Sequence, residues 1–343
     1  MSGPYLMAAI DQFGDAGQVR LREQPPPKPG RGEIVVRVEA ASVNPIDTRR
    51  RAGYGRRLFS LMGAARMPLV LGNDFAGTVC AVGRDVTTLR EGDTVFGAKP
   101  PSSQGTHATH VVVDARLALR QPLGLTAGQL AALPYNFLTV TRALAGAGIT
   151  REAIAGRPVL LHGASGGLGL IALRLLQGMG ARVTAVAGGA NRQACLQAGA
   201  ASVVDRHAVP LHALPREYAA TLNFANWEDD ATLLRLHAPG SLGHATTVHP
   251  LLGQLDQRGL LRGLAASWLM RRSVTTHLPG GARYAWTVFR PDEAALASLA
   301  EWAPLLNLPM TLATYPLDKA AQAHRHVEQH QAGRAILLPH LTT

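Results

Sequence analysis

The hydrophobic pattern changes character along the chain. Before residue 126, apolar residues fall in short runs between glycine-containing turns, and in 33–41 they alternate, with Ile34, Val36 and Val38 on one face. Such alternation is typical of a strand in an antiparallel sheet. Several short runs of this kind predict a small barrel-like domain. The expected strands, besides two within 1–24, are 33–41, 69–82 (broken by Gly72 and Gly77), 92–96 and 105–113.

From Thr126 onward, helix-like segments alternate with short apolar runs. Thr126 and Gln129 have the spacing of a capping box at the start of a helix. Alternation of strands with helices predicts βα units and a parallel sheet. The expected strands are 159–161, 183–186, 202–204, 220–224, 241–247 and 334–338, and the expected helices are 127–133, 138–147, 292–305 and 322–329, with 283–290 either strand or loop.

Residues 159–186 carry the strongest local signal. An apolar run is followed by a glycine-rich turn, an apolar-periodic helix and a second apolar run. In this order, glycines let the backbone approach a pyrophosphate, and the amides at the helix start bind its charge. The alternative is a glycine-rich turn that only packs against its own sheet. The expected cofactor-binding residues of the turn are Gly163, Ala164, Ser165, Gly166, Gly167 and Leu168.

Composition narrows the class of protein. The 343 residues allow two domains, and the net charge of +11 comes almost entirely from arginine. Because the arginines are scattered and no basic helix carries interleaved aromatics, solvated surface arginines are favoured over nucleic-acid binding. No apolar run reaches the roughly 18 residues of a membrane span. The first residues lack the pattern of a signal or transit peptide, so a cytoplasmic protein is expected.

The residues give little support for a bound metal. Cys80 and Cys195 are the two cysteines and lie far apart, which excludes a cysteine-rich zinc lobe. The 13 histidines show no ligand spacing.

Four ordered motifs indicate a family. They are VNPIDTRRRAGYG at 43–55, PLVLGNDFAGTVCAVGRDVTTLREGDTVFGA at 68–98, LPYNFLT at 133–139 and GASGGLG at 163–169. Together they resemble the medium-chain dehydrogenase/reductase superfamily. Within it the chain is similar to the zinc-independent quinone oxidoreductases, in particular the group of the reticulon-interacting mitochondrial oxidoreductase and its bacterial relatives.

The resemblance implies an α/β fold with two domains. A GroES-like β-barrel catalytic domain would take residues 1–126 and 291–343, and a Rossmann domain with a doubly wound parallel sheet would take 127–290. The cleft between them would hold NADP(H) and a small-molecule substrate. The implied reaction is hydride transfer from NADPH to a quinone, an enone or a similar activated double bond, and a homodimer is also expected.

The resemblance also bears on the metal. Zinc-binding relatives carry cysteine where this chain has Asn44, and GHE where it has Gly72, Asn73 and Asp74. Neutral amides are poor zinc ligands, so no metal is expected and polarisation must come from hydrogen-bond donors. Asn44 is the candidate donor beside the nicotinamide, or it only caps a helix with Pro45 at the first position.

Tyr54 is a second candidate for the catalytic site, as a proton donor or a wall of the substrate site. Many quinone oxidoreductases carry tyrosines at the positions of Arg49 and Gly55. This chain lacks them there, which leaves the source of the proton open.

Cofactor choice depends on the residues after Val186. NAD-binding relatives place an acid there for the ribose hydroxyls, whereas this chain continues with small residues such as Gly188 and then Arg192. Arg192 and Arg206 would bind the 2′-phosphate of NADPH, or they are two ordinary surface arginines.

Three further cofactor contacts follow from the resemblance: Thr139, Asn223 in LNFANWEDD, and Phe289, with Trp286 as the alternative aromatic. A core or interface role for these aromatics stays open. Asp229 and Asp230 are expected in the first turn of a helix rather than as an acid–base pair.

A second class of function competes with the enzyme. The chain could be an NADPH-binding sensor or interaction protein with little turnover, and the lack of a clear general acid favours this alternative. Cofactor binding without oxidation in the presence of quinones would distinguish it.

Overall fold

The computed structural model describes residues 5–102, 104–306 and 308–341, and the chain forms two compact units. The first comprises Met1–Tyr135, Pro291–Leu305 and Met310–Thr343, and the second comprises Asn136–Arg290 and Leu306–Pro309. Helix α3 (Ala127–Ala131) lies beyond the expected boundary at 126 but contacts strands of the first unit. The change of hydrophobic pattern at Thr126 therefore marks where helices begin, whereas the first unit continues to Tyr135.

The first unit contains two sheets. The larger has the order β15-β16-β3-β5-β6-β8, with β7 paired to β3, and the smaller has the order β2-β1-β4. Both ends of the chain therefore contribute to this unit. The strands are β1 (Leu6–Ile10), β2 (Arg20–Glu23), β3 (Glu33–Ser42), β4 (Leu69–Val70), β5 (Asp74–Val82), β6 (Thr94–Ala98), β7 (His110–Asp114), β8 (Ala118–Arg120), β15 (Leu312–Pro316) and β16 (Arg334–Leu338).

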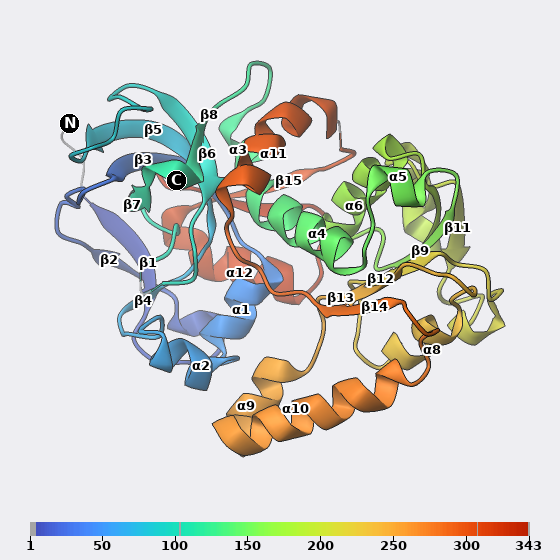
Figure 1. Cartoon of the computed structure of the whole chain (residues 1–343). Coiled ribbons are helices and arrows are strands. Elements are labelled where there is room, and N and C mark those ends of the chain that lie inside the picture. Colours follow the sequence, from blue (N-terminus) through green and yellow to red (C-terminus); the bar gives the residue numbers. More distant parts are fainter. Residues whose placement is uncertain (1–4, 103, 307, 342–343) are drawn as a thin grey trace. The chain divides into compact units, whose positions relative to one another are not determined.

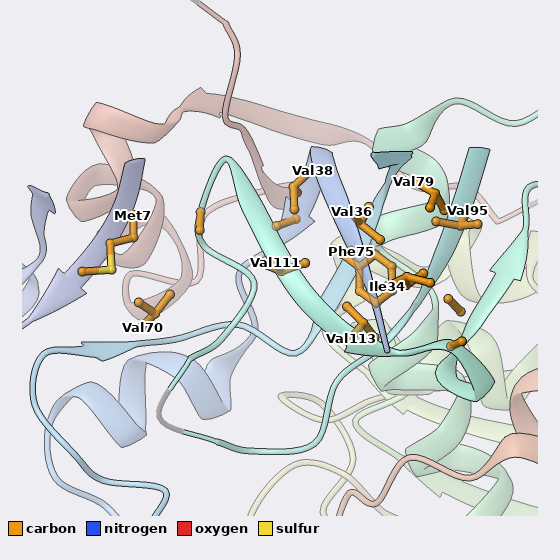
Figure 2. Close-up of a cluster of buried hydrophobic side chains, with 14 of the residues drawn as sticks. Met7, Ile34, Val36, Val38, Val70, Phe75, Val79, Val95, Val111 and Val113 are labelled. Carbon is orange, nitrogen blue, oxygen red and sulfur yellow. The ribbon is translucent and has the colours of Figure 1, made fainter. Parts of the chain in front are cut away.

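The core of the first unit follows from the alternation in β3. Ile34, Val36 and Val38 are fully buried, as the pattern predicts, and Figure 2 shows the Phe75 ring beside Ile34 and Val36. Gly77 was expected to break its strand, but it lies inside β5. A Cβ there would stand 2.0 Å from the Arg37 carbonyl oxygen, so glycine lets β3 and β5 pair closely.

Helices complete the first unit. The sequence pattern predicted no strand or helix for 57–67, but part of this segment is helical. Helix α12 contacts β16 and α1, and its buried face joins Ile10, Leu69 and Leu337 in a second core. Besides α3, the helices are α1 (Pro45–Arg51), α2 (Arg56–Leu61), α11 (Glu293–Leu306, whose last residue falls in the second unit) and α12 (Ala320–Glu328).

The second unit is built on a parallel six-stranded sheet, of which Figure 1 labels β9, β11, β12, β13 and β14. Its order is β11-β10-β9-β12-β13-β14, the doubly wound order that the resemblance implies. The direction of winding reverses between β9 and β12, and in such sheets ligands bind beyond the carboxyl ends of the strands at this point. The strands are β9 (Pro158–His162), β10 (Arg182–Ala187), β11 (Ser202–Asp205), β12 (Ala220–Asn223), β13 (Gly243–Thr246) and β14 (Arg283–Trp286).

Helices connect these strands. The sequence pattern gave no element for 251–278, where the structure has α9 followed directly by the long α10. No helix in the described ranges is long and apolar enough to cross a bilayer. The helices are α4 (Pro134–Gly146, beginning in the last residues of the first unit), α5 (Arg151–Ile154), α6 (Gly167–Gly178), α7 (Arg192–Gln197), α8 (Asp230–Arg235), α9 (Leu251–Arg258) and α10 (Leu260–Thr275).

Candidate functional site

The glycine-rich turn connects the end of β9 to the start of α6. Gly163 has a φ of +81°, and a Cβ on it would lie 2.9 Å from the backbone carbon of Phe224. A Cβ on Gly169 would lie 2.3 Å from the carbonyl oxygen of Ala164. These two glycines are required because the turn packs tightly against the loop after β12 and against its own helix.

Gly166 stands in a different environment. It is the exposed N-cap residue of α6, and a Cβ on it would meet only the Gly163 carbonyl oxygen, at 3.5 Å. The first amides of a helix have no intrahelical acceptor, and they attract anions. Open space in front of these amides fits a pyrophosphate, and a side chain at Gly166 would fill that space.

Asn223 ends β12 and is the register partner of His162, so the two residues flank the point where the sheet reverses. Its Nδ2 donates to the Asn226 carbonyl oxygen (2.6 Å) and to Asp230 Oδ1 (2.9 Å). Its Oδ1 accepts from the Ala225 amide at 3.1 Å. Asn223 therefore shapes the loop after β12 that faces the glycine turn.

The predicted phosphate-binding arginines lie near the carboxyl ends of β10 and β11. Arg192 Nη1 donates to the Val203 carbonyl oxygen at 2.9 Å, and Arg206 Nε donates to His207 Nε2 at 3.1 Å. The Arg206 amide also bonds the last residue of β10, Ala187, at 3.0 Å. Gly188 follows directly, so the structure brings the turn after β10 next to Arg206.

A carboxylate that the sequence analysis missed lies in the same place. Asp205 is the last residue of β11 and pairs with Ala187, the last residue of β10. Its Oδ2 would be 2.5 Å from a Cβ on Gly189, and its Oδ1 accepts from the His207 amide. An acid was expected only directly after Val186, whereas sheet pairing brings one from the neighbouring strand.

His162 is a second residue that the sequence analysis missed. It directly precedes the glycine turn, and its Nε2 lies 2.8 Å from Asp229 Oδ2. Burial lowers the pKa of His162, opposed by the Asp229 carboxylate. The signal was the polar residue that ends an otherwise apolar strand.

The two acids expected at a helix start are there: Asp229 is the N-cap of α8 and Asp230 its first residue. Asp230 is fully buried. Besides the bond from Asn223, it accepts a hydrogen bond from Tyr284 Oη at 2.6 Å, and its Oδ1 lies 2.9 Å from His244 Nε2. Burial raises its pKa, but these contacts outweigh burial and hold the pKa below the usual value. Since Asp230 has no exposed surface, we assign its hydrogen bonds to stabilising the interior of the second unit.

Thr139 and Phe289 also belong to the second unit. Thr139 is buried on α4, and Phe289 follows β14 and is half-buried. Trp286, the alternative aromatic, stacks on His249 with ring centroids 5.0 Å apart and donates to Tyr284 Oη. The half-buried Trp286 ring thus packs beside β14, and Phe289 stays the predicted aromatic contact.

The first unit contains a buried polar cluster around Asn44. Asn44 is the N-cap residue of α1, with Pro45 at the first position, but its side chain makes no capping hydrogen bond. Its Nδ2 donates to Ser42 Oγ (2.9 Å) and to Asp74 Oδ2 (3.0 Å), and its Oδ1 accepts from Arg334 Nη2 (2.8 Å). Both amide hydrogens are therefore used inside the unit.

Asp74 is the centre of this cluster. Besides the Asn44 bond, its carboxylate accepts from Ser42 Oγ and from the Tyr135 amide, each at 2.6 Å. Burial raises the pKa of Asp74 to about 7, although these donors and the charge of Arg334 oppose the shift. The sequence analysis named Asp74 only in the comparison with the zinc-binding motif and assigned it no role, although an acid within the apolar run of 68–79 was a signal.

The cluster does not fit a zinc ion. Zinc requires several deprotonated thiolate, imidazole or carboxylate ligands, whereas Asn44 and Ser42 are neutral. The guanidinium of Arg334, bonded to Asn44, would repel a divalent cation. Among the residues that the structure describes, no group of three or more His, Cys, Asp or Glu side chains could hold a metal.

Tyr54 lies in the turn between α1 and α2. It is half-buried, and the Arg49 guanidinium carbon lies 5.0 Å from the centre of its ring. Asn44 and Tyr54 thus belong to the first unit, whereas the other predicted cofactor residues belong to the second.

Comparison with known proteins shows the family. The model of the alcohol dehydrogenase GroES-like domain matches residues 30–127. NAD(P)H oxidoreductase RTN4IP1 of Bos taurus is 30% identical over 321 residues, which cover 89% of this chain and 81% of that protein. The chain belongs to the medium-chain dehydrogenase/reductase superfamily, as a quinone-oxidoreductase-like protein. It is therefore an oxidoreductase that uses a nicotinamide cofactor and acts on a small molecule.

Solved structures confirm the fold of this quinone-oxidoreductase-like protein. Escherichia coli quinone oxidoreductase complexed with NADPH superimposes with a TM-score of 0.77 at 23% identity, covering 97% of this chain and 100% of that one. The predicted combination of a GroES-like domain with a Rossmann domain is thus confirmed.

The expected location is wrong. The bovine relative and reticulon-4-interacting protein 1 of Caenorhabditis elegans, 31% identical over 83% of this chain and 82% of its own length, are both named as mitochondrial. The cytoplasmic expectation rested on the lack of a recognisable leader. This expectation was weakly supported, because a targeting peptide is cleaved off and is not part of the folded domain.

Proposed function

We propose that the protein transfers hydride from NADPH to a quinone, an enone or a similar activated double bond without a metal ion. The observation that carries the metal-free part is Arg334, whose guanidinium bonds Asn44 at the position where zinc-binding relatives carry a ligand. The cofactor supplies the hydride when bound. The chain supplies binding, orientation and fixed charges.

The second unit would hold the cofactor. Backbone amides from Ser165 to Leu168 bind the pyrophosphate, because they lie at the helix start and open space adjoins Gly166. Arg192 and Arg206 bind the ribose phosphate, for which Gly188 leaves room. The expected remaining contacts come from Thr139, Asn223 and Phe289.

The first unit would position the substrate. Since both amide hydrogens of Asn44 are bound to Ser42 and Asp74, we assign Asn44 a positioning role rather than that of a proton donor. The proton that completes the reduction would come from the Tyr54 hydroxyl or from water. A homodimer stays a prediction.

Turnover after metal removal tests this function. Protein treated with a chelator and then dialysed should oxidise NADPH in the presence of an enone or quinone as fast as untreated protein. Activity that is lost with the chelator and restored by zinc would contradict the proposal. NADPH binding without oxidation by any acceptor would favour the sensor, an alternative that the fully bonded amide of Asn44 supports.

Cofactor preference gives a second prediction. Arg192→Ala together with Arg206→Ala should weaken NADPH binding by roughly tenfold or more per arginine, because charge-assisted phosphate contacts contribute about 1.5–3 kcal/mol each. The affinity for NADH should change little, because NADH lacks the 2′-phosphate. Titration calorimetry with both cofactors measures the difference.

Arg182→Ala is the matched control, since Arg182 is an exposed arginine at the opposite end of β10. It should leave both affinities unchanged. If the parent protein prefers NADH, the preference for NADPH is refuted and Asp205 becomes the residue that binds the ribose hydroxyls.

A further inference from the structure

The first unit contains a pocket of about 460 Å³ whose lining residues include no member of the Asn44 cluster. This volume is within the range of small-molecule sites. Apolar walls come from residues such as Pro68 and Val111, and the titratable side chains on the wall, among the described residues, are Glu33, Lys99 and His110. The pocket therefore combines apolar surface with an amine and a carboxylate.

Lys99 is one of three lysines in the chain. It follows β6, and its Nζ donates to the Val112 carbonyl oxygen at 2.8 Å. Burial lowers the pKa of Lys99 to about 8, with the charge of Glu33 opposing this shift. A desolvated amine of this kind is partly neutral near pH 7.5 and can act as a nucleophile.

The other charged groups around the pocket do not replace this amine. Glu33 accepts from the Gly30 amide at 2.8 Å, so the backbone holds its carboxylate. Burial, together with the nearby His340 and Arg37, lowers the pKa of His110 to about 4, so His110 is neutral at physiological pH. Lys99 is thus the candidate nucleophile of this pocket.

We propose that Lys99 is the reactive amine of a second small-molecule site, which takes small apolar aldehydes as imines. The Nζ lone pair forms a bond to the carbonyl carbon, and the carbonyl oxygen, protonated twice, leaves as water. One proton comes from the amine and one from solvent, so the product is the protonated imine. The step needs no oxidant or reductant, and hydrolysis reverses it. The apolar wall selects an aldehyde without charge.

Reductive trapping tests the proposal on the full chain without NADPH. The protein is mixed with propanal and cyanoborohydride near pH 7.5, and labelling of each lysine is measured by peptide mass spectrometry. An amine with a pKa near 8 is neutral roughly a hundredfold more often than an ordinary lysine. Lys99 should therefore be labelled at least tenfold faster than Lys28 and Lys319, and its rate should saturate with propanal.

Two variants sharpen the result. Lys99→Arg keeps the cation but removes the nucleophile, so the fast, saturable labelling should vanish. Glu33→Gln removes the negative charge that favours the ammonium, so the midpoint of the pH profile for Lys99 labelling should move to lower pH. Labelling of Lys99 at or below the rate of the other two lysines, or a rate that rises linearly without saturation, would overturn the proposal.

Discussion

Gly166→Val is expected to abolish binding of the nicotinamide dinucleotide while the second unit stays folded. The backbone of Gly166 has a φ of −76° and a ψ of 172°, which valine adopts readily, and the space around it is open. The new side chain would stand in front of the helix amides and displace the pyrophosphate. Loss of two or more charge-assisted bonds should raise the dissociation constant by roughly a hundredfold or more.

Gly280→Val is the matched control for this variant. Gly280 also belongs to the second unit and has open space where a Cβ would be placed. It should bind the cofactor like the parent protein, as measured by fluorescence titration. Normal cofactor affinity in Gly166→Val would show that the pyrophosphate binds elsewhere.

Asp74→Ala is expected to have the largest effect on stability. It would remove the acceptor of the bonds from Ser42, Asn44 and the Tyr135 amide and leave the charge of Arg334 without its nearby carboxylate. Removing one partner from a buried charged cluster typically costs about 3–5 kcal/mol. Thermal unfolding should show a decrease in the melting temperature of roughly 10 °C.

Asp11→Ala removes a carboxylate from a half-exposed ion pair with Arg22 and serves as the control. It should change the free energy of unfolding by less than about 1 kcal/mol. Equal effects of the two substitutions would mean that the Asp74 cluster does not support the fold.

The pH dependence of stability distinguishes an electrostatic contribution of the Asp74 cluster from a contribution of packing alone. The pKa of Asp74 is raised from 3.8 to about 7, so the folded protein binds more protons than the unfolded chain between these values. This group's contribution to stability is therefore present below about pH 4 and is lost as the pH rises through about 7. The difference in stability between the parent protein and Asp74→Ala should narrow over this interval, and a constant difference would contradict the assigned pKa shift.

Local patterns were enough to predict the elements that position the site. Alternation in 33–41 gave β3 and its buried face, and the order of strand, glycine turn and helix gave β9 and α6. These predictions succeed because periodicity and backbone freedom are properties of neighbouring residues. The helices in 251–278 were not predicted because the apolar residues there do not mark a single buried face. Leu261, Leu264 and Trp268 of α10 are exposed.

The candidate site was only partly predictable, since its polar contacts join residues far apart in the chain. Asn44 was identified, but its partner Arg334 is 290 positions away on the last strand. Asp205 reaches the end of β10 only because β10 and β11 pair in parallel. Sheet pairing creates such contacts, and a residue pattern in one segment does not contain them.

The destination of the transferred hydrogen tests the central claim most directly. NADPH carrying deuterium at the reactive carbon of the nicotinamide is mixed with metal-free protein and an enone, and the product is examined by mass spectrometry and NMR. Hydride transfer predicts deuterium on the β-carbon of the product, one for each NADPH oxidised. Oxidation of NADPH without deuterium in the product, or no oxidation at all, would contradict the account.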